Sequence, residues 1–140
     1  MVVDDGIGVL DEAECLELLS RSSIGRVAVT IGAVPAVFPV NFRLVDRSIV
    51  FRTGTGTKLD AAVRHAVVAF EVDEVDRLYH EGWSVLVVGV ANELTDPEPL
   101  ERALQLPLEP WAPGDRQFIV RIRLDFVSGR RIDHRHAIRS

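Results

Sequence analysis

Cysteine is nearly absent from this sequence of 140 residues, in which Cys15 is the single example. One cysteine excludes a disulfide framework and any metal cluster held by several thiolates. None of the four histidines has a metal-ligand spacing to another histidine or to Cys15, so we predict no metal site. His134 and His136 flank one residue in a polar tail, and a solvated tail is favoured there over a metal site.

Long apolar runs and a basic N-terminus are also missing. No apolar run approaches the ~20 residues that span a bilayer, and the start "MVVDDGIG" lacks the basic first part and apolar core of a signal peptide. The net charge of −5 provides no broad attraction to nucleic acid or to an anionic membrane. We therefore expect one cytoplasmic domain over residues 1–140 that binds neither.

Several catalytic motifs are absent as well. No Gly-x-Ser-x-Gly elbow is present, and no serine has a context that favours nucleophilic catalysis. The glycines of "FRTGTGTKLD", residues 51–60, have neither the spacing of a P-loop nor that of the dinucleotide fingerprint. The acidic run "EVDEVD", residues 71–76, is better explained as a strand end and turn than as a pair of catalytic carboxylates.

Hydrophobic periodicity predicts a chain made mostly of strands. Residues 34–46 alternate with period two, and Pro35 and Pro39 on the opposite face, which lack N–H donors, indicate an edge or bulged strand. Asp11 and Glu14 form a capping box at the start of the first helix. Strands are predicted over residues 25–32, 34–46, 48–53, 66–76, 82–94 and 116–129, and helices over residues 10–23, 58–65 and 96–106.

These elements favour a mainly β (α+β) fold, an antiparallel barrel with a few short helices. Consecutive strands joined mostly by hairpins fit a barrel and do not fit a doubly wound sheet. The last strand, residues 116–129, is expected to be continuous. Its inward-facing residues are predicted to be Phe118, Val120, Ile122, Leu124 and Phe126.

The stretch of residues 51–60 leaves two interpretations open. Thr57 is placed to cap a helix, so that Lys58 falls in the first turn, where free backbone N–H groups and the helix dipole favour an anion. Arg52 and Lys58 could then supply positive charge to a phosphate, and Thr53, Thr55 and Thr57 could supply hydroxyl donors. The same residues also fit an ordinary strand-to-helix turn with solvated side chains.

Five segments, taken in order, resemble the short-chain branch of the pyridoxamine 5'-phosphate oxidase-like flavin-binding proteins. The resemblance covers residues 10–132 and implies a split β-barrel, a homodimer, and flavin mononucleotide (FMN) in a groove between the subunits. The segments are "PAVFPVNF", "FRTGTGTKL", "VAFEVD", "GWSVLVVGVA" and "VRIRLDFVSGRRI".

The resemblance also implies roles for individual residues. Arg52, Thr53, Thr57 and Lys58 would hold the phosphate. The strand "FPVNF" would lie along the flavin ring, with Phe38, Pro39, Val40 and Asn41 facing the ring edge. Ser84 would be a polar contact, Trp83 beside it would be a flavin contact or a core aromatic, and Trp111 would cover the ring from the partner subunit.

The C-terminal segment departs from the oxidase that gives the family its name. That enzyme binds substrate through an arginine–leucine–histidine–aspartate–arginine segment, whereas this chain has Arg131, Ile132, Asp133, His134 and Arg135. Val127 replaces an expected aromatic residue. The resemblance therefore implies a flavin cofactor. The departures in the C-terminal segment argue against pyridoxamine phosphate as the substrate.

Three functions remain open from the sequence. The first is an FMN-dependent oxidoreductase that acts on an unknown small organic molecule as a homodimer. The second is a reductase on the same fold that uses a deazaflavin, which would need a larger basic groove than Arg52 and Lys58 provide. The third is a non-enzymatic flavin-binding or interaction protein.

Overall fold

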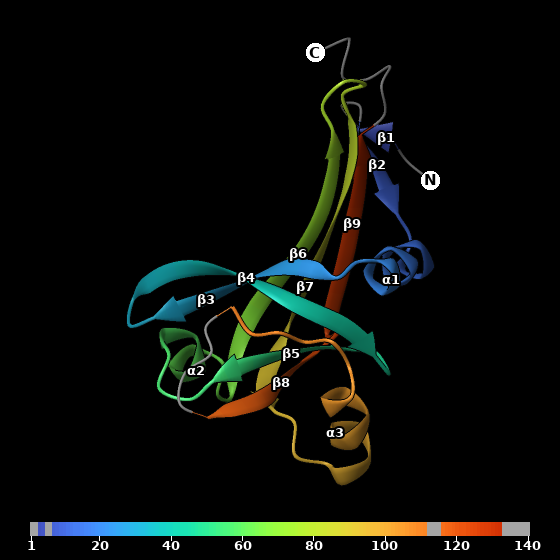
Figure 1. The fold of residues 1–140 in the computed structure, drawn as a ribbon. Helices are drawn as coiled ribbons and strands as arrows, with labels where there is room; N and C mark the ends of the chain where they lie inside the picture. The colour runs from blue at the N-terminus through green and yellow to red at the C-terminus, as the bar shows by residue number, and fades with distance from the viewer. Residues whose placement is uncertain (1–2, 5–6, 112–115, 133–140) are drawn as a thin grey trace.

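In the computed structural model, which describes residues 3–4, 7–111 and 116–132, six antiparallel strands close into a barrel (Figure 1). Each strand pairs with the next in the order β7-β6-β3-β4-β5-β8, and a β7–β8 pairing closes the ring. The strands are β3 (Ile24–Ile31), β4 (Val34–Val45), β5 (Ser48–Gly54), β6 (Ala66–Asp76), β7 (Glu81–Glu93) and β8 (Gln117–Arg123). The predicted antiparallel split barrel is confirmed.

Three further strands extend the sheet beyond the barrel. β9 (Phe126–Ile132) pairs with the first half of β7, and β2 (Ile7–Leu10) and the two-residue β1 (Val3–Asp4) follow it. With the long ends of β6 and β7 they form an arm that projects from the barrel (Figure 1). β7 therefore belongs to both the barrel and the arm.

The prediction of one continuous strand over residues 116–129 is wrong, because β8 and β9 are separate strands. β8 pairs with Ala91–Glu93 of β7 and β9 pairs with Gly82–Val88, so the chain bends between them at Leu124 and Asp125. A Cβ atom on Gly89 would lie 1.8 Å from the Arg123 carbonyl oxygen, so glycine permits this close crossing. Phe126, predicted to face inward, is 54% exposed because it starts the new strand.

Local sequence explains the three short helices. α1 (Glu12–Arg21) begins with the expected capping box, in which the Asp11 side chain accepts the Glu14 N–H at 2.8 Å and the Glu14 side chain accepts the Asp11 N–H at 3.1 Å. α1 lies against β9 and β4, and its Leu18 and Leu19 are buried. α2 (Lys58–Ala62) follows β5, and α3 (Pro97–Leu104), with prolines in its first turn, follows β7.

The barrel interior is apolar and centred on aromatic side chains. Phe42 and Phe70 meet edge to face with ring centroids 4.7 Å apart, and Phe51 is buried with them. β4 pairs with β3 along residues 34–41 but with β5 only from Phe42 to Val45. Pro35 and Pro39 therefore lie where β4 has one neighbour, and the predicted edge is confirmed. That open edge is next to the candidate site.

No helix within the described residues is both long enough and apolar enough to cross a lipid bilayer.

Candidate functional site

A cavity of about 200 Å³ lies between β4, β5, α2 and the segment that follows α3. All of its lining residues except Leu59 are among the site residues that the sequence predicts. The lining residues are Phe38, Pro39, Val40, Arg52, Thr53, Leu59 and Trp111. The fold thus brings the predicted ring strand and part of the predicted phosphate group to one place.

Thr53 supplies an unusual polar atom to this cavity. The residue is 1% exposed, and its hydroxyl oxygen Oγ1 has no hydrogen-bond partner among the described residues. A buried hydroxyl without a partner is costly, because it has lost water and gained nothing in return. Asn92 Oδ1 and Arg121 Nε are also buried without a partner among the described residues, but of the three residues Thr53 is the one that lines the cavity, where a ligand would complete its hydrogen bonding.

Arg52, the residue before Thr53 on β5, adds a positive charge to the lining of the cavity. Its side chain is half-buried, and the hydrogen bond found for it within the described residues is a long one, from Nη1 to Gln117 Oε1 at 3.4 Å. The described residues give it no carboxylate partner, in contrast to Arg26, which contacts Glu71 and Asp73. Most of the donor capacity of the guanidinium is therefore available to an anionic group.

The remaining lining of the cavity is apolar. Phe38, Pro39 and Val40 come from β4, Leu59 from α2, and Trp111 from the segment after α3. Trp111 lines the cavity of its own chain, although the resemblance implies a contact from the partner subunit. Apolar walls with a few convergent polar groups are typical of small-molecule sites.

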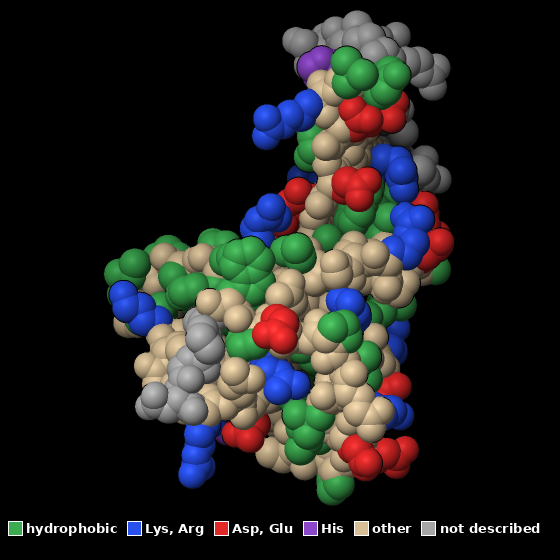
Figure 2. All heavy atoms as spheres, viewed as in Figure 1, with side chains coloured by type: hydrophobic (Ala, Val, Ile, Leu, Met, Phe, Trp, Pro, Cys, Tyr) green, Lys and Arg blue, Asp and Glu red, His purple; other side chains and the backbone are tan. Residues whose placement is uncertain are grey.

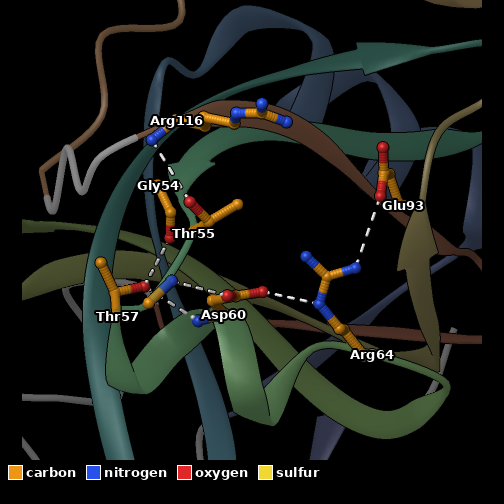
Figure 3. Close-up of polar contacts among 8 residues, drawn as sticks. Gly54, Thr55, Thr57, Asp60, Arg64, Glu93 and Arg116 are labelled. Atoms are coloured by element: carbon orange, nitrogen blue, oxygen red, sulfur yellow. Dashed lines mark hydrogen bonds and ion pairs between the residues drawn. The ribbon is translucent and has the colours of Figure 1, made fainter.

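The polar groups of the glycine–threonine loop, residues 54–57, form hydrogen bonds within the chain (Figure 3). The Thr57 hydroxyl donates to the Gly54 carbonyl at 2.9 Å and accepts the Asp60 N–H at 3.0 Å, so it caps α2 as predicted. The Asp60 carboxylate accepts the Gly56 N–H at 2.8 Å and the Arg64 Nε–H at 2.7 Å (Figure 3). The Gly56 N–H is thus hydrogen-bonded to a carboxylate of the chain and is not free to donate to a phosphate.

Two predicted phosphate residues consequently do not line the cavity. Lys58 is exposed at the start of α2, and Thr57 uses its hydroxyl proton within the loop. Leu59, which does line the cavity, was predicted only as part of the apolar side of the helix. Its helical spacing to Ala62 and Val63 predicts a buried apolar face and does not distinguish a residue that contacts a ligand from a core residue.

Trp83 and Ser84 also lie outside the cavity of their own chain. They are half-buried on β7 in the arm, where Trp83 pairs across the sheet with Glu74 and Arg131. Trp83 packs against the barrel core and lines a different hollow. Any contact of these two residues with a ligand in the cavity would have to come from a second copy of the chain.

Asn41 is beside the cavity without lining it. Its side-chain Nδ2 donates to the backbone carbonyl of Glu109 at 2.8 Å, two residues before Trp111. Of the C-terminal residues noted in the sequence, Val127, Arg131 and Ile132 belong to β9. Asp133, His134 and Arg135 lie outside the described residues.

Comparison with known proteins places this architecture in a family. A sequence model of the pyridoxamine 5'-phosphate oxidase family matches residues 11–131, which is most of the chain. The chain belongs to the pyridoxamine 5'-phosphate oxidase family. The family that the five ordered segments resemble is thereby confirmed.

Individual relatives of this family member agree with that assignment. Uncharacterized protein Rv0080 of Mycobacterium tuberculosis (strain ATCC 25618 / H37Rv) is 40% identical over 128 residues, which cover 88% of this chain and 84% of the relative. The FAD binding protein from Mycobacterium smegmatis has a TM-score of 0.77 at 35% identity, covering 89% of this chain and 97% of that structure. The conserved protein of unknown function DIP1874 from Corynebacterium diphtheriae has a TM-score of 0.73 at 36% identity, covering 91% and 98%.

Proposed function

We propose that this chain binds a flavin nucleotide, FMN, in the cavity of β4 and β5 and acts as an oxidoreductase on a small organic molecule. The observation that carries the proposal is a cavity whose lining is apolar except for two residues: Arg52, which has no carboxylate partner among the described residues, and Thr53, whose buried hydroxyl is unpartnered. Membership of the pyridoxamine 5'-phosphate oxidase family and the FAD-binding relative from Mycobacterium smegmatis support a flavin as the ligand.

The residues of the cavity fit the two chemical halves of such a ligand. The Arg52 guanidinium and the Thr53 hydroxyl would hold the phosphate, since both offer hydrogen-bond donors. Phe38, Val40 and Trp111 would contact the apolar ring system and exclude water from it. A bound flavin would supply hydride or electron transfer, and the protein would supply binding, orientation and the electrostatic environment.

We further propose that the active form is a homodimer. The cavity of about 200 Å³ in one chain is smaller than the roughly 300–1,000 Å³ usual for such ligands, so part of the nucleotide must contact another surface. A second copy would bring Trp83 and Ser84 of its arm toward the site, where the resemblance expects them.

An apolar row on the outside of the sheet supports this assembly. The residues of the row neighbour one another across five strands, from β4 to β9: Val37, Ala28, Ala69, Val88 and Phe126. Its two ends, Val37 and Phe126, are 61% and 54% exposed. Hydrophobic side chains also gather over the β3–β4 hairpin in Figure 2. Contiguous apolar surface of this kind commonly marks an interface.

A titration of the purified protein tests the proposed cofactor. We expect the absorption spectrum of FMN to shift on addition of protein and to saturate at one flavin per chain. Parallel titrations with FAD and with a deazaflavin determine which nucleotide binds most tightly. Tighter binding of FAD or of the deazaflavin would replace FMN in the proposal, and binding of none of the three would overturn the proposed function.

A further inference from the structure

The segment of residues 105–111, here called the strap, connects α3 to the cavity and carries Trp111 at its end. It leaves α3, crosses the barrel near β4 and β5, and forms one wall of the cavity (Figure 1). Pro107 and Pro110 lack N–H groups, so these positions of the strap cannot donate a backbone hydrogen bond to the open edge of β4. The strap therefore needs other contacts to hold its position.

Packing holds only the first half of the strap. Leu108 is 2% exposed and belongs to a small cluster with Val50, Ala103 and Ile119 beneath α3. Beyond Leu108, the strap lies between two hollows. One is the cavity that Trp111 lines, and the other, of about 140 Å³, is lined by Leu106–Pro110 together with Arg52 and Gln117. Little packing therefore fixes the position of Trp111, which is 57% exposed.

Asn41 supplies the contact that packing does not. Its Nδ2 donates to the Glu109 carbonyl at 2.8 Å, and among the described residues this is the side-chain hydrogen bond that joins the strap to the barrel. Asn41 follows Phe38, Pro39 and Val40 on β4, all of which line the cavity. The same strand thus provides one wall of the cavity and the hydrogen bond to the strap, which carries Trp111 on another wall.

We propose that Asn41 is a positioning residue, which holds the strap so that Trp111 forms a wall of the flavin site. This role differs from the direct flavin contact that the resemblance implies for Asn41. The part of the proposal that concerns flavin rests on the proposed function, whereas the part that concerns the strap does not. The two parts can therefore be tested separately.

The test variant is Asn41→Asp, which keeps the shape of the side chain but replaces the donor with a carboxylate that faces a carbonyl oxygen. The matched control for the exchange measurement is Gln117→Glu, the same amide-to-carboxylate change at a residue that lines the smaller hollow. Gln117 uses its oxygen to accept from Arg52, so glutamate preserves that bond. All proteins carry Trp83→Phe, which makes Trp111 the single tryptophan, since the sequence has two.

The first measurement is hydrogen exchange in the absence of flavin. In Asn41→Asp we expect the amides of residues 105–111 to exchange roughly two- to tenfold faster, the range that one net hydrogen bond supports. The amides of β5 should not change, and Gln117→Glu should match its parent. Unchanged exchange of the strap in Asn41→Asp would overturn the proposal, whatever happens to flavin binding.

The second measurement is the quenching of Trp111 fluorescence by FMN. We expect Asn41→Asp to bind FMN roughly two- to tenfold more weakly than the Trp83→Phe parent. Even at saturation its Trp111 should be quenched less, because the indole is no longer held against the flavin. A looser strap with unchanged affinity and quenching would overturn the positioning role. If neither the natural chain nor the Trp83→Phe parent binds flavin, the proposed function fails, and the exchange experiment still decides whether Asn41 holds the strap.

Discussion

The hydroxyl of Thr53 links stability to binding at the scale of a single residue. Thr53→Val has nearly the same shape and removes the unpartnered polar atom. We expect the variant to unfold at a higher urea concentration, with about 1 kcal/mol more stability, because the buried hydroxyl no longer costs free energy. FMN affinity should fall by about tenfold, since one hydrogen bond to a charged group is lost.

Equilibrium unfolding and FMN titration of the same preparations check both effects. Thr55→Val is the control, because Thr55 is in the neighbouring loop and does not line the cavity. A variant that loses stability and keeps its full affinity for FMN would contradict the role assigned to Thr53.

Arg52 and Lys58, which the sequence suggests as a pair of phosphate residues, are separated by the structure. Arg52 lines the cavity, whereas Lys58 is exposed outside it. We expect Arg52→Ala to weaken FMN binding by at least about tenfold, as for the loss of a charge-assisted hydrogen bond. Lys58→Ala should change the affinity less than about threefold, because an exposed charge is screened by solvent.

Isothermal titration calorimetry with FMN compares these two variants, with circular dichroism as a check of the fold. Equal losses in both variants would show that the phosphate contacts the start of α2 as well as Arg52 in the cavity. In that case the internal bonds between Asp60 and Gly56 would have to open when the ligand binds.

At the scale of an element, β6 carries a group whose titration falls near neutral pH. Burial, followed by the neighbouring Asp73 carboxyl, raises the pKa of Glu71 from 4.5 to about 7, and Arg26 opposes that shift from 3.2 Å away. Arg26 on β3 and Leu86 on β7 are its cross-strand neighbours. The folded chain therefore binds more protons here than the unfolded chain between pH 4.5 and 7.

Because of that difference, the Glu71 carboxyl lowers the free energy of unfolding as the pH rises from 4.5 to 7. We expect Glu71→Gln, which stays neutral, to lose less stability than the natural chain over the same interval. Thermal melts at half-unit pH steps measure the two slopes, and Glu74→Gln on the same strand is the control. Parallel slopes for the natural chain and Glu71→Gln would contradict the assignment.

At the scale of the whole molecule, the apolar row from Val37 to Phe126 predicts the oligomeric state. We expect the natural chain to sediment as a dimer and Val37→Glu to sediment as a monomer, because a charge would then be buried without a partner. If Trp83 and Ser84 of the second copy complete the site, the monomer should also bind FMN at least about tenfold more weakly.

Leu104→Glu is the control for this experiment, since Leu104 is an exposed apolar residue on α3, away from the row. Sedimentation velocity gives the mass, and FMN titration of the same samples gives the affinity. A natural chain that is monomeric at all concentrations, or a dimeric Val37→Glu, would overturn the proposed interface.

Much of the architecture follows from local patterns in the sequence. The capping box of Asp11 and Glu14 and the cap of Thr57 depend only on residues three positions apart, so they can be predicted without the fold. The edge character of β4 follows from the missing N–H groups of Pro35 and Pro39. The order of the five segments was enough to indicate the family.

The tertiary structure alone decided which predicted site residues meet. Phe38, Arg52 and Trp111 are far apart in the chain and line one cavity, whereas Trp83 and Ser84 lie in the arm. It also decided where the last predicted strand bends, because the neighbour of β7 changes from β9 to β8 at Gly89. Residue type shows what a side chain can donate or accept, but its actual partners depend on distances in space. For that reason the sequence by itself could not show that Asn41 bonds to the strap or that Thr53 has no partner among the described residues.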